Sequence, residues 1–187
     1  MSDPAREPRC VRRVLRALYD GAAYLAAAFI VAIFAIMIGG SAMRLLGVST
    51  GGSDDLVAWC CAAAAFLAMA HTFRRGDFVR VMLLLDKLGA RRRHAFEVGA
   101  LAVAAVFCGY LAWAAAYFVY ESWSFNDYAN GLIAVPLWIP QSSFVVGTIL
   151  LLAAVVEELV AALRGRKPSY AIAVEERHAR GDFSEDI

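Results

Sequence analysis

Four stretches of the chain contain no Asp, Glu, Lys or Arg and are long enough to cross a bilayer as helices. They are residues 21–43, 56–73, 98–120 and 128–156. A helix needs roughly 20 apolar residues to cross about 30 Å of hydrocarbon. The second run is close to the lower limit, and the fourth contains two prolines. The sequence therefore predicts an integral membrane protein with four transmembrane helices.

The composition supports an all-α fold. Hydrophobic residues make up 61% of the chain and the mean hydropathy is +0.60, whereas ordinary soluble domains are about 45–50% apolar. The runs are continuously apolar, while the strands of a membrane barrel alternate over about ten residues. Four helices are therefore expected, rather than barrel strands.

The chain divides into three parts. A basic segment, 1–20, precedes a membrane domain, 21–164, with spans at about 21–43, 56–73, 98–120 and 132–156, and a charged tail follows at 165–187. The first run has 23 uncharged residues, more than the 7–15 of a signal-peptide core, so we expect a retained signal anchor. The tail mixes charges with Gly and Pro, which predicts a mobile extension or a short surface helix.

The distribution of positive charge predicts the topology. Five Lys or Arg residues precede the first span, seven lie between the second and third, and five follow the fourth; the first loop has only Arg44 and the third loop has none. Because positive residues stay on the cytoplasmic side, both termini and the connection between spans two and three are predicted to be cytoplasmic.

That connection contains an amphipathic segment. Phe78, Val81, Met82, Leu85 and Leu88 form one helical stripe, which predicts a short helix lying in the membrane interface. The candidate contacts to lipid phosphates are Arg74, Arg75, Arg80, Arg91, Arg92 and Arg93. The connection is either a topology and surface anchor or a docking surface for another subunit. Since orientation accounts for the basic residues, no nucleic acid partner is expected.

The spans offer no catalytic group. A carrier working alone usually needs an ionisable residue or a broken helix near the bilayer midplane, and His71 lies at the cytoplasmic end of its span, as an interfacial histidine would. Haem ligation needs paired histidines inside spans, but His94 and His178 lie outside them. No phosphate-binding loop, zinc cluster, nucleophile motif or C-x-x-C pair occurs. We therefore predict no catalytic, cofactor or metal site, and no enzyme.

Small residues recur at four-residue spacing in the spans, which lets helix backbones approach closely in lipid. The pairs are Ala58 and Ala62, Ala64 and Ala68, Ala100 and Ala104, Ala105 and Gly109, and Ala112 and Ala116. They serve packing either within the chain or against a larger partner.

Two groups of residues outside the cytoplasmic connection are candidate partner contacts. Pro136 and Pro140 predict a kink or a late start of the fourth helix; Gln141, Ser142 and Ser143 either satisfy the freed backbone groups or contact another subunit. On the outer side, Ser53 is a candidate N-cap, and Asp54 and Asp55 complement the helix dipole or form a recognition patch with Trp59. Trp123 and Trp138 fit an interfacial aromatic belt.

Three segments carry a family resemblance: SDDLVAWCCAAAAFLAMAHTFRRGDFVRVMLLLDKL, the ARRR before span three, and NGLIAVPLWIPQSSFVVGTILLL. Over residues 19–164 the chain resembles the DctQ-like small membrane subunit of tripartite ATP-independent periplasmic (TRAP) transporters. The resemblance implies a bacterial inner-membrane complex with a large multi-span permease subunit and a periplasmic solute receptor, taking up an organic acid with sodium. The small subunit would brace the large one and help dock the receptor. The alternative is an independent small carrier or integral membrane enzyme.

Overall fold

The computed structural model of the chain describes residues 9–48, 51–75, 90–129 and 134–165. Within these residues it has four α-helices: α1 (Arg9–Leu45), α2 (Ser53–Arg75), α4 (Ala90–Ser124) and α5 (Trp138–Leu163). Each is long and apolar enough to cross a membrane, which confirms the predicted all-α fold with four such helices. The predicted interfacial helix within 76–89 lies outside the described residues.

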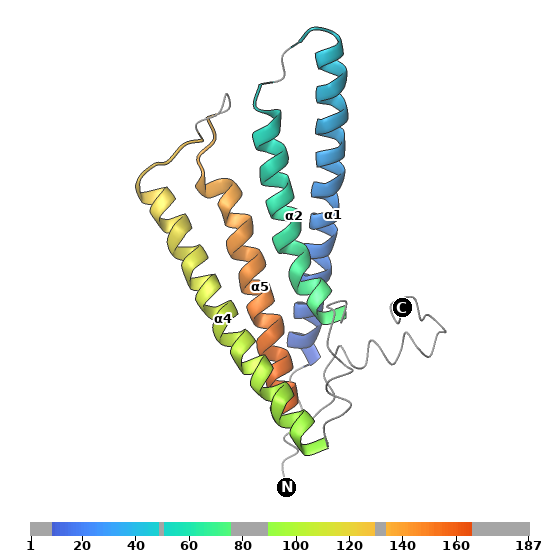
Figure 1. The fold of residues 1–187 in the computed structure, drawn as a ribbon, viewed down its shortest axis with the longest axis vertical. Coiled ribbons are helices and arrows are strands. Elements are labelled where there is room, and N and C mark those ends of the chain that lie inside the picture. Colours follow the sequence, from blue (N-terminus) through green and yellow to red (C-terminus); the bar gives the residue numbers. More distant parts are fainter. Residues whose placement is uncertain (1–8, 49–50, 76–89, 130–133, 166–187) are drawn as a thin grey trace, which may run out of the picture.

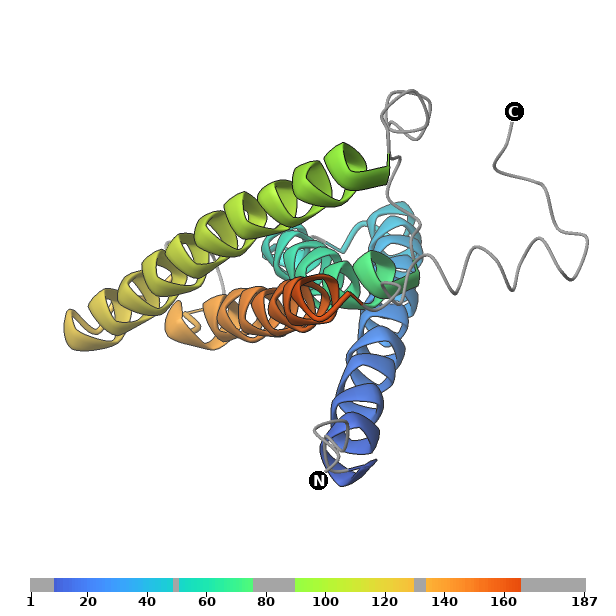
Figure 2. The same ribbon diagram turned by 90° about the horizontal axis from the view of Figure 1, so that it is seen from below.

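The helices form an open row in the order α4, α5, α2, α1 (Figure 1). Helix α5 packs on α4 and on α2, and α2 also packs on α1. Helices α1 and α4 therefore lie at the two edges of the row, as the view from below also indicates (Figure 2). Large apolar side chains remain exposed along both edge helices, as expected where lipid or another membrane protein covers them.

The contact between α2 and α5 depends on a glycine. A Cβ atom at Gly147 would lie only 2.5 Å from the backbone oxygen of Phe66, so α5 approaches the backbone of α2 more closely than any other residue type allows. Next to this crossing the rings of Phe66 and Phe144 meet edge to face, with centroids 4.2 Å apart. The glycine and the ring pair together fix where the two central helices cross.

Most of the fully buried residues are small. Ala70 and Ala154 are completely buried at the α2–α5 contact, and Ala26 is buried on α1. Of the small-residue pairs, Ala64 is buried and Ala68 is partly buried against α1, which confirms packing within the chain for that pair. Other pairs behave differently: Ala58 and Ala62 are exposed on α2, and Ala112 is buried while Ala116 is exposed.

The row has two distinct ends. At the loop end, α1 turns into α2 and α4 connects to α5; at the terminal end, α1 and α4 begin and α2 and α5 finish (Figure 1). The turn before α2 uses Gly47 and Gly52, with φ of 78° and 87°, values that glycine adopts without steric cost. The predicted N-cap residue, Ser53, lies at the first position of α2, directly after Gly52.

Helix α5 begins at Trp138, later than the predicted start of the fourth span at 132, and continues to Leu163. The preceding chain folds back on itself instead, because Ala129 N donates to Val135 O at 3.0 Å and Leu137 N donates to Asp127 O at 2.9 Å. This is the late start that the two prolines predicted.

Candidate interaction sites at the two ends of the row

At the loop end the acidic pair opens α2. Asp54 and Asp55 occupy its first turn, where carboxylates complement the positive end of the helix dipole. Asp54 Oδ1 lies 3.7 Å from Arg44 Nη2 of α1, and the Asp54 side chain is 92% exposed. So exposed a pair contributes roughly 0–1 kcal/mol to stability. The helix dipole accounts for one role of Asp54 and Asp55, and the exposed Asp54 carboxylate is also accessible to a partner.

A small pocket lies between α1 and α2 beside this ion pair. Its lining residues are Ile36, Met37, Gly40, Ser41, Arg44, Ser53, Asp54 and Val57. Trp59, the third residue predicted for this patch, is partly buried one turn further along α2. The structure therefore brings Arg44 to Asp54, a neighbour that the sequence pattern linked only to topology.

The start of α5 holds the second predicted group. Pro140 lies in the first helical turn, where backbone N–H groups have no partner within the helix, so its missing donor costs little. Ser142 Oγ donates to Ile139 O at 2.6 Å, and Ser143 Oγ donates to Pro140 O at 2.7 Å. Both serines thus donate to backbone carbonyls of the first turn, but the Pro136 carbonyl, which Pro140 leaves without its helical donor, accepts from Ile139 N at 3.1 Å instead.

Gln141 behaves differently from the serines that follow it. Its side-chain oxygen Oε1 is buried without a hydrogen-bond partner in the described part of the structure, a costly state for a carbonyl group. Nearby, Pro136 pairs with Tyr128 in an isolated β-bridge, and Trp138 is 40% exposed. Because this oxygen is buried within the chain, it is not presented to another subunit, and a polar contact of Gln141 with a partner stays a prediction.

The terminal end contains a polar cluster that joins three helices. We call Tyr19, Asp20, His71, Arg74 and Glu157 the terminal cluster. Arg74 Nη1 lies 3.6 Å from Glu157 Oε2 of α5, and its guanidinium carbon lies 4.6 Å from the centre of the Tyr19 ring of α1. His71 Nδ1 lies 3.5 Å from Asp20 Oδ1. Residues of α2 therefore tie both neighbouring helices together.

Most of this cluster was not predicted from the sequence, because an uncharged run ends at the first charged residue although the helix continues beyond it. Helix α5 continues through Glu157 and Glu158, and Glu158 is only 3% exposed. The helical period would have revealed the burial of Glu158: Leu151, Val155 and Glu158 follow at i, i+4 and i+7, and all three are buried. Of the arginines proposed as lipid contacts, Arg74 is instead mostly buried in protein contacts.

The remaining predicted lipid contacts are not tested by the described residues. Arg80 lies outside them. Arg75 ends α2, and Arg91, Arg92 and Arg93 lie in the first turn of α4, but the described part of the structure does not include their side chains. Among the described residues no group of three or more His, Cys, Asp or Glu side chains could hold a metal ion, and Cys60, Cys61 and Cys108 are free thiols.

Four apolar helices, with their Asp, Glu, Lys and Arg residues gathered at the two ends of the row, define a multi-pass membrane protein. Residues 33–165 match the family model of the DctQ component of tripartite ATP-independent periplasmic transporters. Because the match covers more than half of the chain, the chain belongs to the DctQ family and is a transporter component of that type. None of the curated proteins compared with the chain matches it.

Proposed function

We propose that this chain is the small permease subunit of a TRAP transporter, a non-catalytic scaffold that braces the large permease subunit and helps dock the periplasmic receptor. The transporter would take up an organic acid with sodium. The observation that carries this proposal is the open row itself, one helix thick and with two unpaired edges. A single layer of helices has no interior in which to enclose a solute.

The position of the charges supports the same role. Between the two ends of the row, residues 21–43, 56–73, 98–120 and 138–156 contain no Asp, Glu, Lys or Arg. A carrier that couples solute movement to an ion gradient usually needs such groups near the bilayer midplane. In the proposed complex the large subunit supplies them, and this chain supplies a rigid apolar surface.

The charge distribution supports an orientation in the bacterial inner membrane. Seventeen of the eighteen Lys and Arg residues belong to segments at the terminal end or beyond it, so the terminal end would face the cytoplasm and the loop end the periplasm. That orientation presents the exposed Asp54 carboxylate to the receptor. Basic groups on the receptor surface would be its natural counterparts.

Co-expression with the neighbouring transporter genes tests the proposal. We expect the tagged chain to retain a large permease subunit on purification, and we expect uptake in liposomes only when large subunit, small subunit and receptor are all present. Consistent purification of the chain without a permease subunit would contradict the scaffold role. Uptake of an organic acid by liposomes holding this chain alone would favour the independent carrier.

A further inference from the structure

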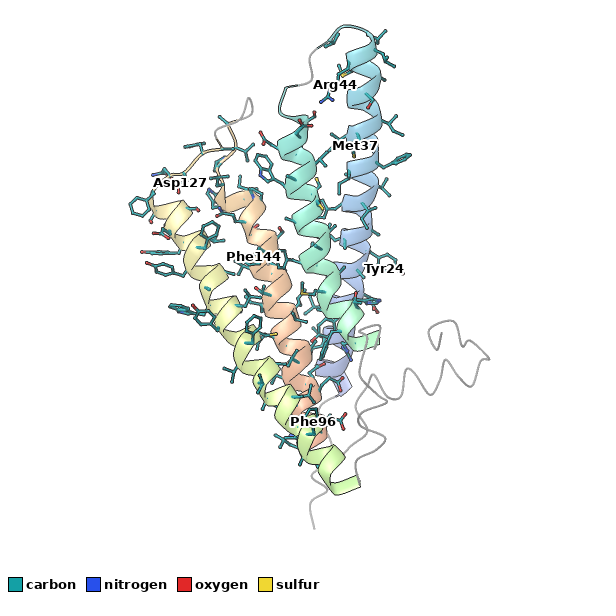
Figure 3. All side chains as sticks on the ribbon, in the orientation of Figure 1. Tyr24, Met37, Arg44, Phe96, Asp127 and Phe144 are labelled. Carbon is teal, nitrogen blue, oxygen red and sulfur yellow. The ribbon has the colours of Figure 1, made fainter. Side chains whose placement is uncertain are left out.

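The outer edge of α4 carries an aromatic and β-branched stripe that is largely exposed. Its members are Val103, Val106, Tyr110, Trp113, Tyr117 and Tyr120, and all six are more than half exposed. Aromatic side chains project from the side of α4 that faces away from α5 (Figure 3). The opposite side of α4, with Leu101, Cys108 and Ala115, is buried. The helix thus has one buried face and one face that is exposed within the described part of the structure.

The spacing of the stripe is that of a helix–helix seam. Its members follow one another at alternating steps of three and four residues, the pattern by which side chains of one helix insert between those of another. Neighbouring rings also support each other: the ring centres of Tyr110 and Trp113 are 5.9 Å apart, and those of Trp113 and Tyr117 are 6.0 Å apart. The first pair is tilted and the second is stacked, and such a ladder of rings loses little conformational entropy on binding.

Two rings of this ladder lie too deep for an interfacial belt. The uncharged part of α4, 98–120, is centred on Gly109, so at 1.5 Å per residue Tyr110 lies about 1.5 Å and Trp113 about 6 Å from its middle. Belt residues lie at the headgroups, about 15 Å from the midplane. Tyr110 is 65% and Trp113 63% exposed, and neither polar group has a hydrogen bond in the described part of the structure. Acyl chains cannot accept a hydrogen bond from the phenol of Tyr110 or the indole of Trp113.

The other edge of the row provides the contrast. The exposed side chains along the middle of α1 are Ile30, Val31, Phe34, Met37 and Ile38. None of them carries a hydrogen-bond donor, so acyl chains suit this surface fully. The two edges therefore differ in chemistry although both are exposed.

We infer that the stripe on α4 is the surface on which a transmembrane helix of the large permease subunit docks, while the outer surface of α1 faces lipid. This inference rests on the proposed function and specifies which face of the chain contacts the large subunit. The docked helix should present small residues, which leave room for the rings, and acceptors at mid-depth for Tyr110 and Trp113. A second copy of α4 fits less well, because it would bring bulky rings against bulky rings.

Photocrosslinking in the complete complex tests the choice of face. The photoreactive residue p-benzoylphenylalanine replaces either Trp113 or Phe34 in the full chain, co-expressed with the large subunit and the receptor. We expect an adduct with the large subunit from position 113 and several-fold less from position 34. The reverse pattern overturns this inference but keeps the proposed function, and an adduct between two copies of the chain at position 113 also overturns it. Loss of the large subunit from the unmodified complex overturns both.

A second measurement isolates the polar groups. The double variant Tyr110→Phe with Trp113→Phe keeps an aromatic ring at both positions, with a phenyl ring in place of the larger indole, and removes both donors. Interhelical hydrogen bonds in membranes average about 0.6 kcal/mol, so losing two should weaken association roughly eightfold. The matched control is Tyr24→Phe on α1, which removes a phenol from the other edge and should leave association unchanged. Equal retention of the large subunit in the double variant and the control contradicts the proposed contact.

Discussion

The substitution Gly147→Ala tests whether the α2–α5 crossing holds the row together. The added Cβ would lie 2.5 Å from the carbonyl oxygen, 2.6 Å from the carbonyl carbon and 2.7 Å from the Cβ of Phe66. Two of these atoms belong to the backbone and the third is fixed to it, so no side-chain rotation relieves the clash. The helices themselves must move apart.

The size of the effect follows from these distances. An ordinary contact begins near 3.4 Å, so the helices must separate locally by about 0.9 Å. Overpacking of this kind costs typically 1–3 kcal/mol, and the higher helix propensity of alanine returns up to about 1 kcal/mol. We expect a net loss of about 1–2 kcal/mol, or roughly a 5- to 30-fold shift toward the unfolded state.

Thermal unfolding of the purified chain in detergent, followed by tryptophan fluorescence, measures this loss. The matched controls are Gly99→Ala, where the added Cβ meets nothing within 4 Å, and Gly109→Ala, where it meets only Leu152 Cδ1 at 3.9 Å. Both controls should be neutral or slightly stabilising, because alanine is the better helix former. If Gly147→Ala has the same melting temperature as the two controls, α5 does not cross α2 closely at Phe66 and the prediction is wrong.

Three further predictions concern the ends of the row. Asp54→Ala combined with Asp55→Ala should reduce receptor-dependent uptake more than it reduces recovery of the complex; unchanged uptake at equal protein levels would leave only helix capping for the pair. Arg74→Ala should lower the unfolding free energy by about 1–2 kcal/mol through loss of the Tyr19 ring contact, and Arg74→Lys should recover only part of it, since an ammonium does not stack as a guanidinium does; a melting temperature equal to wild type would contradict this. Pro140→Ala should change the melting temperature little, because the proline lies in the first turn of α5; a large change would indicate a role beyond helix initiation.

The number and type of the helices were predictable because uncharged runs of sufficient length have few other folds in a membrane. The late start of α5 also followed from local chemistry, through Pro136 and Pro140. The order of the helices in the row could not be predicted from the sequence, because helices that are apolar all round have no polar face to orient them. Ala64 and Ala58 both belong to small-residue pairs on α2, yet the first is buried and the second is exposed.

The terminal cluster shows why charge alone is an incomplete guide to the ends of membrane helices. Counted in the sequence, Arg74 is one of many orienting cations, and Glu157 marks the end of a span. In the structure the two lie 3.6 Å apart, and both are shielded from solvent more than surface ion pairs are. A pair in such surroundings is screened less than one in water, so it can hold α2 against α5 while remaining at the level of the headgroups. Sequence reasoning could have found it by extending each span until the helical period failed.

A row held together in this way has consequences for its role. The central helices α2 and α5 are held by a glycine crossing in the middle and by the Arg74–Glu157 contact at the terminal end, with α1 joined through His71 and Arg74. Among the described residues these contacts define one packing of the helices, whereas a carrier needs two alternative packings to expose a site first to one side and then to the other. A rigid layer whose two edges differ in chemistry instead suits a stationary support, with one edge toward lipid and the aromatic edge toward the protein that moves.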